Sequence, residues 1–511
     1  MSTEAAMTGA MPVSAEARKT FAVCFAALVA TSFCFILRAF SIGAWGVEFD
    51  LSETQKGELA GVGLWPFAIS IVLLSLIIDR IGFKTTLWFA AACHLLGLVL
   101  ILQADGYWSL YWGTFVLSLG NGAVEAGINP LIAREFRHDK TTWLNRLHAG
   151  WPAGFVLGGL LAMMFPAGMG WRYQMGLILI PVITYIVMLI PRVFPPSERV
   201  AAGITYREML AEAGFISALV VAFMMISELA RVFEWGPALK WGLIAALTVG
   251  YGLWSRSAGK PLFIVMILVM IPLAITELGT DSWITEILTP AMTNLGVNAG
   301  WVLVYAMAIV MVLRLFAGPI VHRFSPLGLL AISSLVAVVG LWLLSDATSA
   351  IAIVVAATVY SFGKAFFWPT SLGVVAEQSP RGGAITLNVV AGIGMLGAGV
   401  IGGPLIGQVL DRQIVQGVAA YDAQNNTQLV ETLKTERTGI FGDYTAIDPA
   451  KRATLDGAPK AAVDAADRES KHDALRTIAI LPGIMFLVYL GLILWFRSRG
   501  GYKPVVLELK N

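Results

Sequence analysis

The stretch SLIIDRIGFKTT (75–86) is a short charged turn between two long apolar runs, 57–78 and 86–103. Each run holds about 20 residues with few or no charges, which is enough for a helix to cross the hydrocarbon core of a bilayer. The same alternation continues along the 511 residues, of which 57% are hydrophobic and 13% charged. We therefore predict an all-helical, polytopic membrane protein.

Working outward from this turn, the chain divides into six, two and six predicted membrane helices, about fourteen in all. The first six occupy 1–200, a linker with an extra hairpin occupies 201–258, and the last six occupy 259–511. A hydrophilic stretch at 411–474 interrupts the last group and holds few apolar residues. We expect this stretch to be a partly disordered loop rather than a small folded cap.

Basic residues indicate which way the helices run. Lys and Arg gather in alternate loops, including 80–84, 134–140 and 192–207, whereas the opposite loops are short or acidic, as in VEFDLSE (47–53). Because cytoplasmic loops carry the excess of Lys and Arg, we predict a protein of the inner membrane with both termini in the cytoplasm. The net charge of +2 gives no indication of nucleic-acid binding, and we predict no metal or cofactor.

An internal repeat relates the two six-helix groups. GNGAVEAGINP (120–130) corresponds to SFGKAFFWP (361–369), and each is followed by a Leu-Asn pair that opens another apolar run. Matching the final prolines and the Leu-Asn pairs gives two sets of equivalent residues. These are Glu125 with Lys364, and Asn145 with Asn388.

The turn at 75–86 resembles the cytoplasmic G-x-x-x-D-R-x-G-R-K motif of the major facilitator superfamily. The first glycine and one arginine of the motif are replaced here, and the matching residues are Asp79, Arg80, Gly82 and Lys84. The resemblance implies two parallel six-helix halves around a central site, with the extra hairpin between them. It also implies that the motif stabilises one closed state. We expect Arg314, nearer the cytoplasmic end of its helix, to act as a gate or to lock a loop.

Two subfamilies share further features with the chain. The motif E-x-x-x-N-P (125–130), followed by Leu144 and Asn145, resembles the fucose:proton symporters, in which the fourth-helix glutamate helps to couple sugar to protons. The first-helix acid of those symporters is missing, and Arg38 lies near its place. An arginine in the first helix with a glutamate in the fourth is instead similar to the anion:cation symporters of sugar acids.

Glu125 is the most prominent of the charges inside predicted membrane helices. A charged side chain at the bilayer centre costs roughly 2.5–3.5 kcal/mol, so it should face a partner or a water-filled cavity. Asn121 and Asn129 lie one turn to either side of Glu125 on the same helix face. Pro130 leaves a main-chain carbonyl without its helical donor. We predict that Glu125 carries a proton, the alternative being a fixed pair with a neighbouring helix.

The remaining charges are expected to reach the same cavity. Arg38 is predicted to grip a substrate carboxylate, or to pair with Glu125 or an acid of the seventh helix. Glu277 and Asp281 are two acids one turn apart, which repel each other when both are ionised. We therefore expect either that one of them stays protonated or that they pair with Arg38 or a lysine. Other polar and aromatic side chains share faces with these residues. Besides Glu277 and Asp281, the further predicted cavity residues are His148 beside Asn145, and Trp368 beside Lys364.

These features favour a secondary active transporter that moves a sugar or sugar acid by alternating access, coupled to protons, as a monomer. Export of amphipathic compounds is an alternative, although deep charges of both signs suit a polar substrate better. A membrane sensor that binds without transporting is another. We expect no enzyme activity, because the chain carries none of the GxSxG, HExxH or Walker A motifs.

Overall fold

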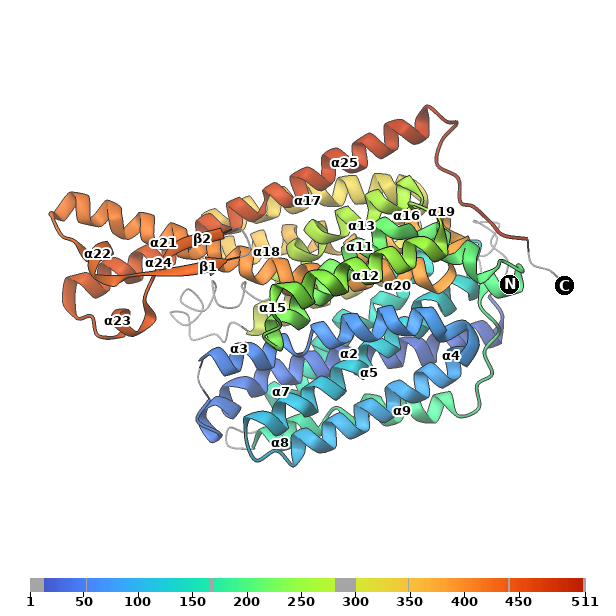
Figure 1. Ribbon diagram of the computed structural model, residues 1–511, viewed down its shortest axis with the longest axis horizontal. Helices are drawn as coiled ribbons and strands as arrows, with labels where there is room; N and C mark the ends of the chain where they lie inside the picture. Colours follow the sequence, from blue (N-terminus) through green and yellow to red (C-terminus); the bar gives the residue numbers. More distant parts are fainter. Residues whose placement is uncertain are drawn as a thin grey trace.

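The computed structural model describes residues 13–51, 53–164, 170–280, 300–347, 349–439 and 442–508. Two helical bundles, one from each half of the chain, run alongside each other (Figure 1). Both termini lie at one end of the molecule, which we call the terminus end (Figure 1).

The N-terminal half is built from long helices interrupted at glycines and prolines. α4 is broken at Gly82, where φ is 81° and ψ is 158°, a backbone conformation that glycine adopts without strain. The charged turn of the sequence therefore joins two helices. The helices of this half are α2 (Ala15–Glu48), α3 (Glu53–Gly61), α4 (Trp65–Leu102), α5 (Tyr107–Glu135), α6 (Lys140–His148), α7 (Gly150–Met164), α8 (Trp171–Gly176) and α9 (Leu179–Leu189).

The C-terminal half repeats this plan. Its helices up to the cap are α13 (Pro261–Ala274), the π-helix η1 (Ile275–Gly279), α15 (Gly300–Leu315), α16 (Ala317–Phe324), α17 (Pro326–Asp346), α18 (Ala350–Lys364), α19 (Phe367–Gln378), the 3₁₀ turn η2 (Pro380–Gly382), α20 (Gly383–Leu396) and the π-helix η3 (Gly397–Gly402). α25 (Ile480–Arg497) completes it, and a tail to residue 508 returns along the terminus end (Figure 1).

The linker between the halves contains α10 (Glu198–Ala201), α11 (Tyr206–Val232) and α12 (Pro237–Ser255). α11 and α12 run antiparallel across the front of the molecule in Figure 1. α11 packs against α20 and η2, whereas most side chains of α12 are exposed. An apolar helix exposed in this way is suited to contact with lipid.

Ten helices of the described chain are long and apolar enough to cross a bilayer, or eleven if the bent pair α15 and α16 forms one span. The predicted count of about fourteen is therefore not confirmed. Part of the difference is that Gln55–Leu102 counts once although it is broken at Gly82. α5 is also left out, and its apolar run is interrupted by Asn121, Glu125 and Asn129.

The prediction of a partly disordered loop at 411–474 is wrong, because this stretch folds as a cap. The cap projects at the end opposite the termini (Figure 1) and has its own small core of Val418, Leu433, Ile447, Val463 and Ala466. Its few apolar residues suffice because they converge from separate elements. These are α21 (Gly403–Asn425), α22 (Leu429–Leu433), the antiparallel pair β1 (Lys434–Gly439) and β2 (Gly442–Ile447), α23 (Pro449–Ala453) and α24 (Gly457–Ile478).

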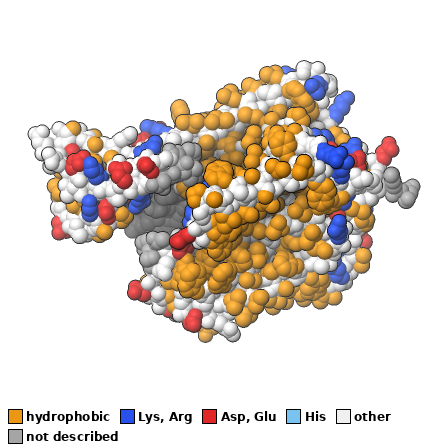
Figure 2. Space-filling model, in the orientation of Figure 1, with side chains coloured by type: hydrophobic (Ala, Val, Ile, Leu, Met, Phe, Trp, Pro, Cys, Tyr) orange, Lys and Arg blue, Asp and Glu red, His pale blue; other side chains and the backbone are white. Residues whose placement is uncertain are grey.

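The surface divides into three zones along the long axis. Figure 2 shows hydrophobic side chains over the middle of this face, basic side chains gathered at the terminus end, and charges of both signs on the cap. A broad apolar zone between two charged ends matches the profile of a bilayer. The fold therefore presents a membrane-embedded body with a polar cap at one end.

Candidate functional site

A chain of hydrogen bonds starts at Glu125 inside the N-terminal half. Glu125 and Asn129 are buried one turn apart on α5, and Asn129 Nδ2 donates to Glu125 Oε2 at 2.7 Å. His148 Nε2, at the end of α6, lies 3.0 Å from Asn129 Oδ1. The amide of Asn129 thus connects the carboxylate of Glu125 to the imidazole of His148.

Asn121 is not part of the hydrogen-bond network that starts at Glu125. His94 Nε2 lies 2.9 Å from Asn121 Oδ1, and His94 Nδ1 lies 3.1 Å from the hydroxyl of Tyr185 on α9. The polar stripe predicted along α5 is therefore divided between two networks. The Asn121 network joins three helices of the same half, which is a packing role.

Arg314 on α15 occupies the junction between the halves, and all three of its guanidinium nitrogens have partners. Nη2 donates to Glu277 Oε1 at 2.7 Å, and Nε donates to the carbonyl of Ala365 at 2.6 Å. Nη1 reaches into the other half and donates to the carbonyl of His148 at 3.1 Å. The structure thus places Arg314 beside the Glu125 network, where the two halves meet.

Arg38 on α2 is buried in a different way. Its side chain makes no hydrogen bond or ion pair with any residue that the structure describes, and its Nε is enclosed without a partner. The guanidinium carbon lies 5.0 Å from the centre of the Phe35 ring. Gly63 makes room for it, since a Cβ there would lie 1.3 Å from Nη1. The predicted alternative, a pair with Glu125, is not formed.

Lys364 on α18 is buried, with its Nζ 5.3 Å from the centre of the Tyr360 ring. Glu125, its equivalent in the internal repeat, bonds to Asn129 within its own half. Asp281, the other acid proposed for this cluster, lies outside the described residues.

Asn145 and Trp368 lie where the halves meet. Asn145 Nδ2 donates to Thr370 Oγ1 on α19 at 3.0 Å and to the carbonyl of Thr141 at 2.9 Å. Trp368 is buried against α20, where a Cβ on Gly394 would lie 2.7 Å from its ring. Asn145 thus joins the halves, and Trp368 packs within one of them.

The residues of the sequence motif gather at the terminus end. Asp79 Oδ2 accepts from Arg199 Nε at 2.8 Å and from Arg199 Nη2 at 2.5 Å. Lys84 Nζ donates to the carbonyl of Ile190 at 2.9 Å, and Arg80 lies over the ring of Tyr206. Sequence reasoning missed Arg199, which reaches this turn from the linker helix α10.

A second interface at the terminus end was also missed. Glu377 Oε1 on α19 accepts from the main-chain N–H and hydroxyl of Thr141 on α6, at 3.2 and 2.5 Å. Its Oε2 accepts from the hydroxyl of Tyr502 in the C-terminal tail at 2.7 Å. Burial beside this carboxylate raises the pKa of Tyr502 well above its usual range. The tail therefore binds the same glutamate that joins the two halves.

Comparison with known proteins agrees with this architecture. Residues 20–402 match the family model described as the Major Facilitator Superfamily. A cis,cis-muconate transport protein of Acinetobacter baylyi is 30% identical over 33% of this chain and 41% of the relative. A gentisate transporter of Corynebacterium glutamicum is 24% identical over 35% of this chain and 41% of the relative. The matches thus span about two-fifths of each relative's length.

Two solved structures show the same fold. The proton:xylose symporter XylE superposes with a TM-score of 0.62 at 12% identity, covering 94% of this chain and 96% of that one. The E. coli fucose:proton symporter FucP gives a TM-score of 0.53 at 14% identity, covering 91% and 99%. The family's members are transporters and not enzymes. With the family match covering most of the sequence, this chain belongs to the Major Facilitator Superfamily.

Proposed function

We propose that this protein is a secondary active transporter that moves a small organic acid across the inner membrane together with protons. The observation that carries the proposal is the guanidinium of Arg38, which is buried and has no anion beside it in the described structure. Leaving a charged group buried without a partner costs free energy. Such a group is retained where a ligand supplies the missing partner.

A carboxylate is the ligand that fits Arg38 best. The guanidinium presents parallel N–H donors that match the two oxygens of a carboxylate, and the resulting bonds are charge-assisted. The Phe35 ring beside it offers an apolar face for the body of the substrate. Muconate and gentisate, named for the two sequence relatives, are both carboxylates. We therefore favour an organic acid over the neutral sugars named for XylE and FucP.

Glu125 is the proposed proton carrier. It is buried, makes no ion pair in the described structure, and holds a single side-chain hydrogen bond to Asn129. Through Asn129 and His148 it is connected to Arg314, which belongs to the other half. A change in the charge of Glu125 thus affects the contact between the halves. Coupling to alternating access requires such an effect.

The direction in the membrane follows from charge. Lys and Arg gather at the terminus end in Figure 2, and basic loops face the cytoplasm in membrane proteins. We infer that both termini are cytoplasmic and that the cap lies on the outer side. The contacts between Thr141 and Glu377 then close the cytoplasmic side.

Uptake into proteoliposomes tests the function. The panel contains gentisate, muconate, glucuronate and xylose, each with and without an inward proton gradient. We expect the gradient to stimulate uptake of an acid, Arg38→Gln to abolish that uptake, and Glu125→Gln to remove the stimulation. Arg231→Gln is the matched control, because Arg231 is paired with Glu228 on the extra hairpin. Uptake of xylose alone, or acid uptake that survives Arg38→Gln, would contradict the proposal.

A further inference from the structure

In three hydrogen bonds of the described chain, a side chain of one half donates to a main-chain carbonyl of the other half. The donors come from α6, α15 and α20, so both halves contribute. The three bonds, each 3.1 Å long, are Lys140 Nζ to the carbonyl of Ala376, Arg314 Nη1 to that of His148, and Asn388 Nδ2 to that of Ala126.

Each of these carbonyls lies four residues before a proline. Ala126 precedes Pro130, His148 precedes Pro152, and Ala376 precedes Pro380. A helical carbonyl normally accepts from the N–H four residues later, and proline has no N–H to donate. Pro130 removes this partner inside α5, whereas Pro152 and Pro380 follow the ends of α6 and α19 and supply no N–H that could extend these helices over the carbonyl. In each case a donor from the opposite half binds the free carbonyl.

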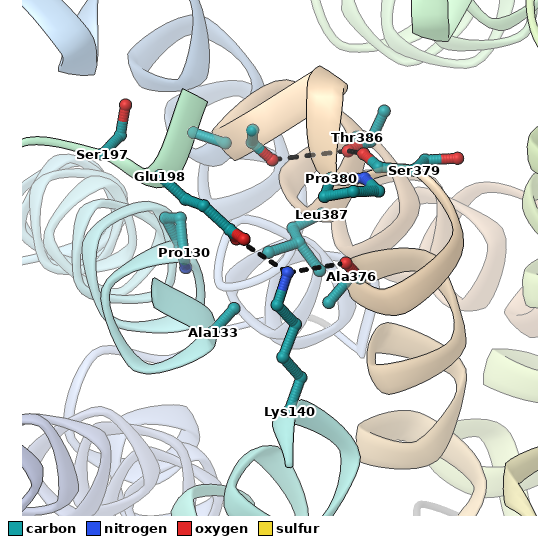
Figure 3. Close-up of a pocket in the computed structure, with 12 residues that line it drawn as sticks. Pro130, Ala133, Lys140, Ser197, Glu198, Ala376, Ser379, Pro380, Thr386 and Leu387 are labelled. Atoms are coloured by element: carbon teal, nitrogen blue, oxygen red, sulfur yellow. Dashed lines mark hydrogen bonds and ion pairs between the residues drawn. The ribbon is translucent and has the colours of Figure 1, made fainter. Parts of the chain in front are cut away.

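The three sites lie along one interface. Figure 3 shows Lys140 between Glu198 and Ala376, in a small cavity also lined by Pro130 and Pro380. Lys140 Nζ lies 2.7 Å from Glu198 Oε2, so its charge is balanced by the linker helix α10. The hydrogen bond from Lys140 Nζ to the carbonyl of Ala376 is the contact that Lys140 makes with the other half.

We propose that Pro130, Pro152 and Pro380 make the contact between the halves reversible, each by freeing a carbonyl for a donor of the other half. When the halves separate, water entering the gap satisfies both the donor and the carbonyl. A carbonyl bonded within its helix offers no such exchange. The prolines are thus positioning residues for alternating access, and the proposal holds whatever the substrate is.

Asn388 gives the clearest case. Its bond to Ala126 is the only side-chain hydrogen bond it makes in the described structure, and its Oδ1 is buried without a partner. Asn145, its equivalent in the internal repeat, donates across the interface to Thr370, the residue after Pro369. The two asparagines therefore reach from opposite halves toward the proline-containing turns of α5 and α19.

The test measures how readily the interface opens. In the purified full-length chain, the three cysteines are replaced by alanine and Ala384→Cys serves as the reporter. Ala384 is fully buried and lines the cavity that holds Lys140. The rate of maleimide labelling then reports opening. Asn388→Ala and Pro130→Ala should each raise this rate about fivefold, the effect expected from loss of one hydrogen bond.

The double variant separates a shared bond from independent effects. Because both changes remove the same contact, Asn388→Ala with Pro130→Ala should label no faster than the faster single variant. Pro181→Ala is the matched control, because the carbonyl freed by Pro181, that of Leu177, accepts from Ile180 of the same segment at 3.1 Å. Its labelling rate should not change.

Two results would overturn the proposal. One is a Pro130→Ala variant that folds and labels at the parent rate, since alanine restores the N–H that competes for the Ala126 carbonyl. The other is a double variant whose rate is the product of the two single effects. Pro130→Ala replaces a helix breaker by a helix former, so it decides the question even where Asn388→Ala impairs folding. Size-exclusion chromatography checks the fold of each variant.

Discussion

Arg38 and Arg314 are two buried arginines, one in each half, and they differ in the partners of their guanidinium groups. Arg314 has a partner for each guanidinium nitrogen, including a carboxylate and two main-chain carbonyls. Arg38 has none among the described residues and rests against Phe35 and Gly63. A buried charge that is fully bonded holds the structure together, whereas one that is left unbonded is available to a ligand.

Arg314→Gln should have the largest effect on the fold. It leaves Glu277 buried without its guanidinium and removes the bond to the other half, so we expect unfolding to become easier by about 3–5 kcal/mol. Transport should be lost as well. Thermal unfolding measures the change, and Glu277→Gln added to Arg314→Gln should recover part of the stability. A stable Arg314→Gln protein would show that the cluster is not structural.

Arg38→Gln should change stability in the other direction. Removing a buried charge that has no partner should leave the ligand-free protein equally stable or about 1 kcal/mol more stable. Uptake of the acid should nevertheless be abolished. A large loss of thermal stability would mean that Arg38 has a structural partner and would remove the contrast with Arg314.

Gly63→Ala sharpens the comparison by moving Arg38 without removing its charge. The added methyl group takes the space of the guanidinium, which lies at the end of a flexible chain and must shift. We expect the KM for the acid to rise roughly tenfold, the effect of a modest overpacking strain. Gly61→Ala is the control, because its Cβ meets nothing within 4 Å. Equal KM values for the two variants would contradict this role of Gly63.

Tyr502→Phe should have the smallest effect. It removes one hydrogen bond to Glu377 but leaves the bonds from Thr141, so the closed interface should weaken by about 1 kcal/mol. A small rise in the labelling rate of the Ala384→Cys reporter would confirm this. A rate unchanged in Tyr502→Phe would mean that the tail does not contribute to closure.

The sequence predicts the parts of this account that depend on local chemistry. A single arginine in the apolar first helix is enough to identify Arg38, and Glu125 stands out on α5 for the same reason. The glycine of the charged turn also indicates the break in α4. These features need no knowledge of the partners.

Partners that are distant in the chain could not be predicted in this way. Prolines show which carbonyls are free, but Asn388 is 262 residues from the carbonyl of Ala126 that it binds. The prediction for Arg314 used only its place along one predicted helix. In the structure that helix, α15, bends by 66° into α16 directly after Arg314. The cap was missed because its core residues are sparse in each segment and meet only after folding.

The central claim is that Arg38 binds the carboxylate of the substrate. The most direct measurement is thermal unfolding of the purified protein with and without gentisate, compared with Arg38→Gln under the same conditions. Ligand that binds the folded state raises the unfolding temperature. We predict that gentisate stabilises the parent protein and leaves Arg38→Gln unchanged. Equal stabilisation of both proteins would contradict the account.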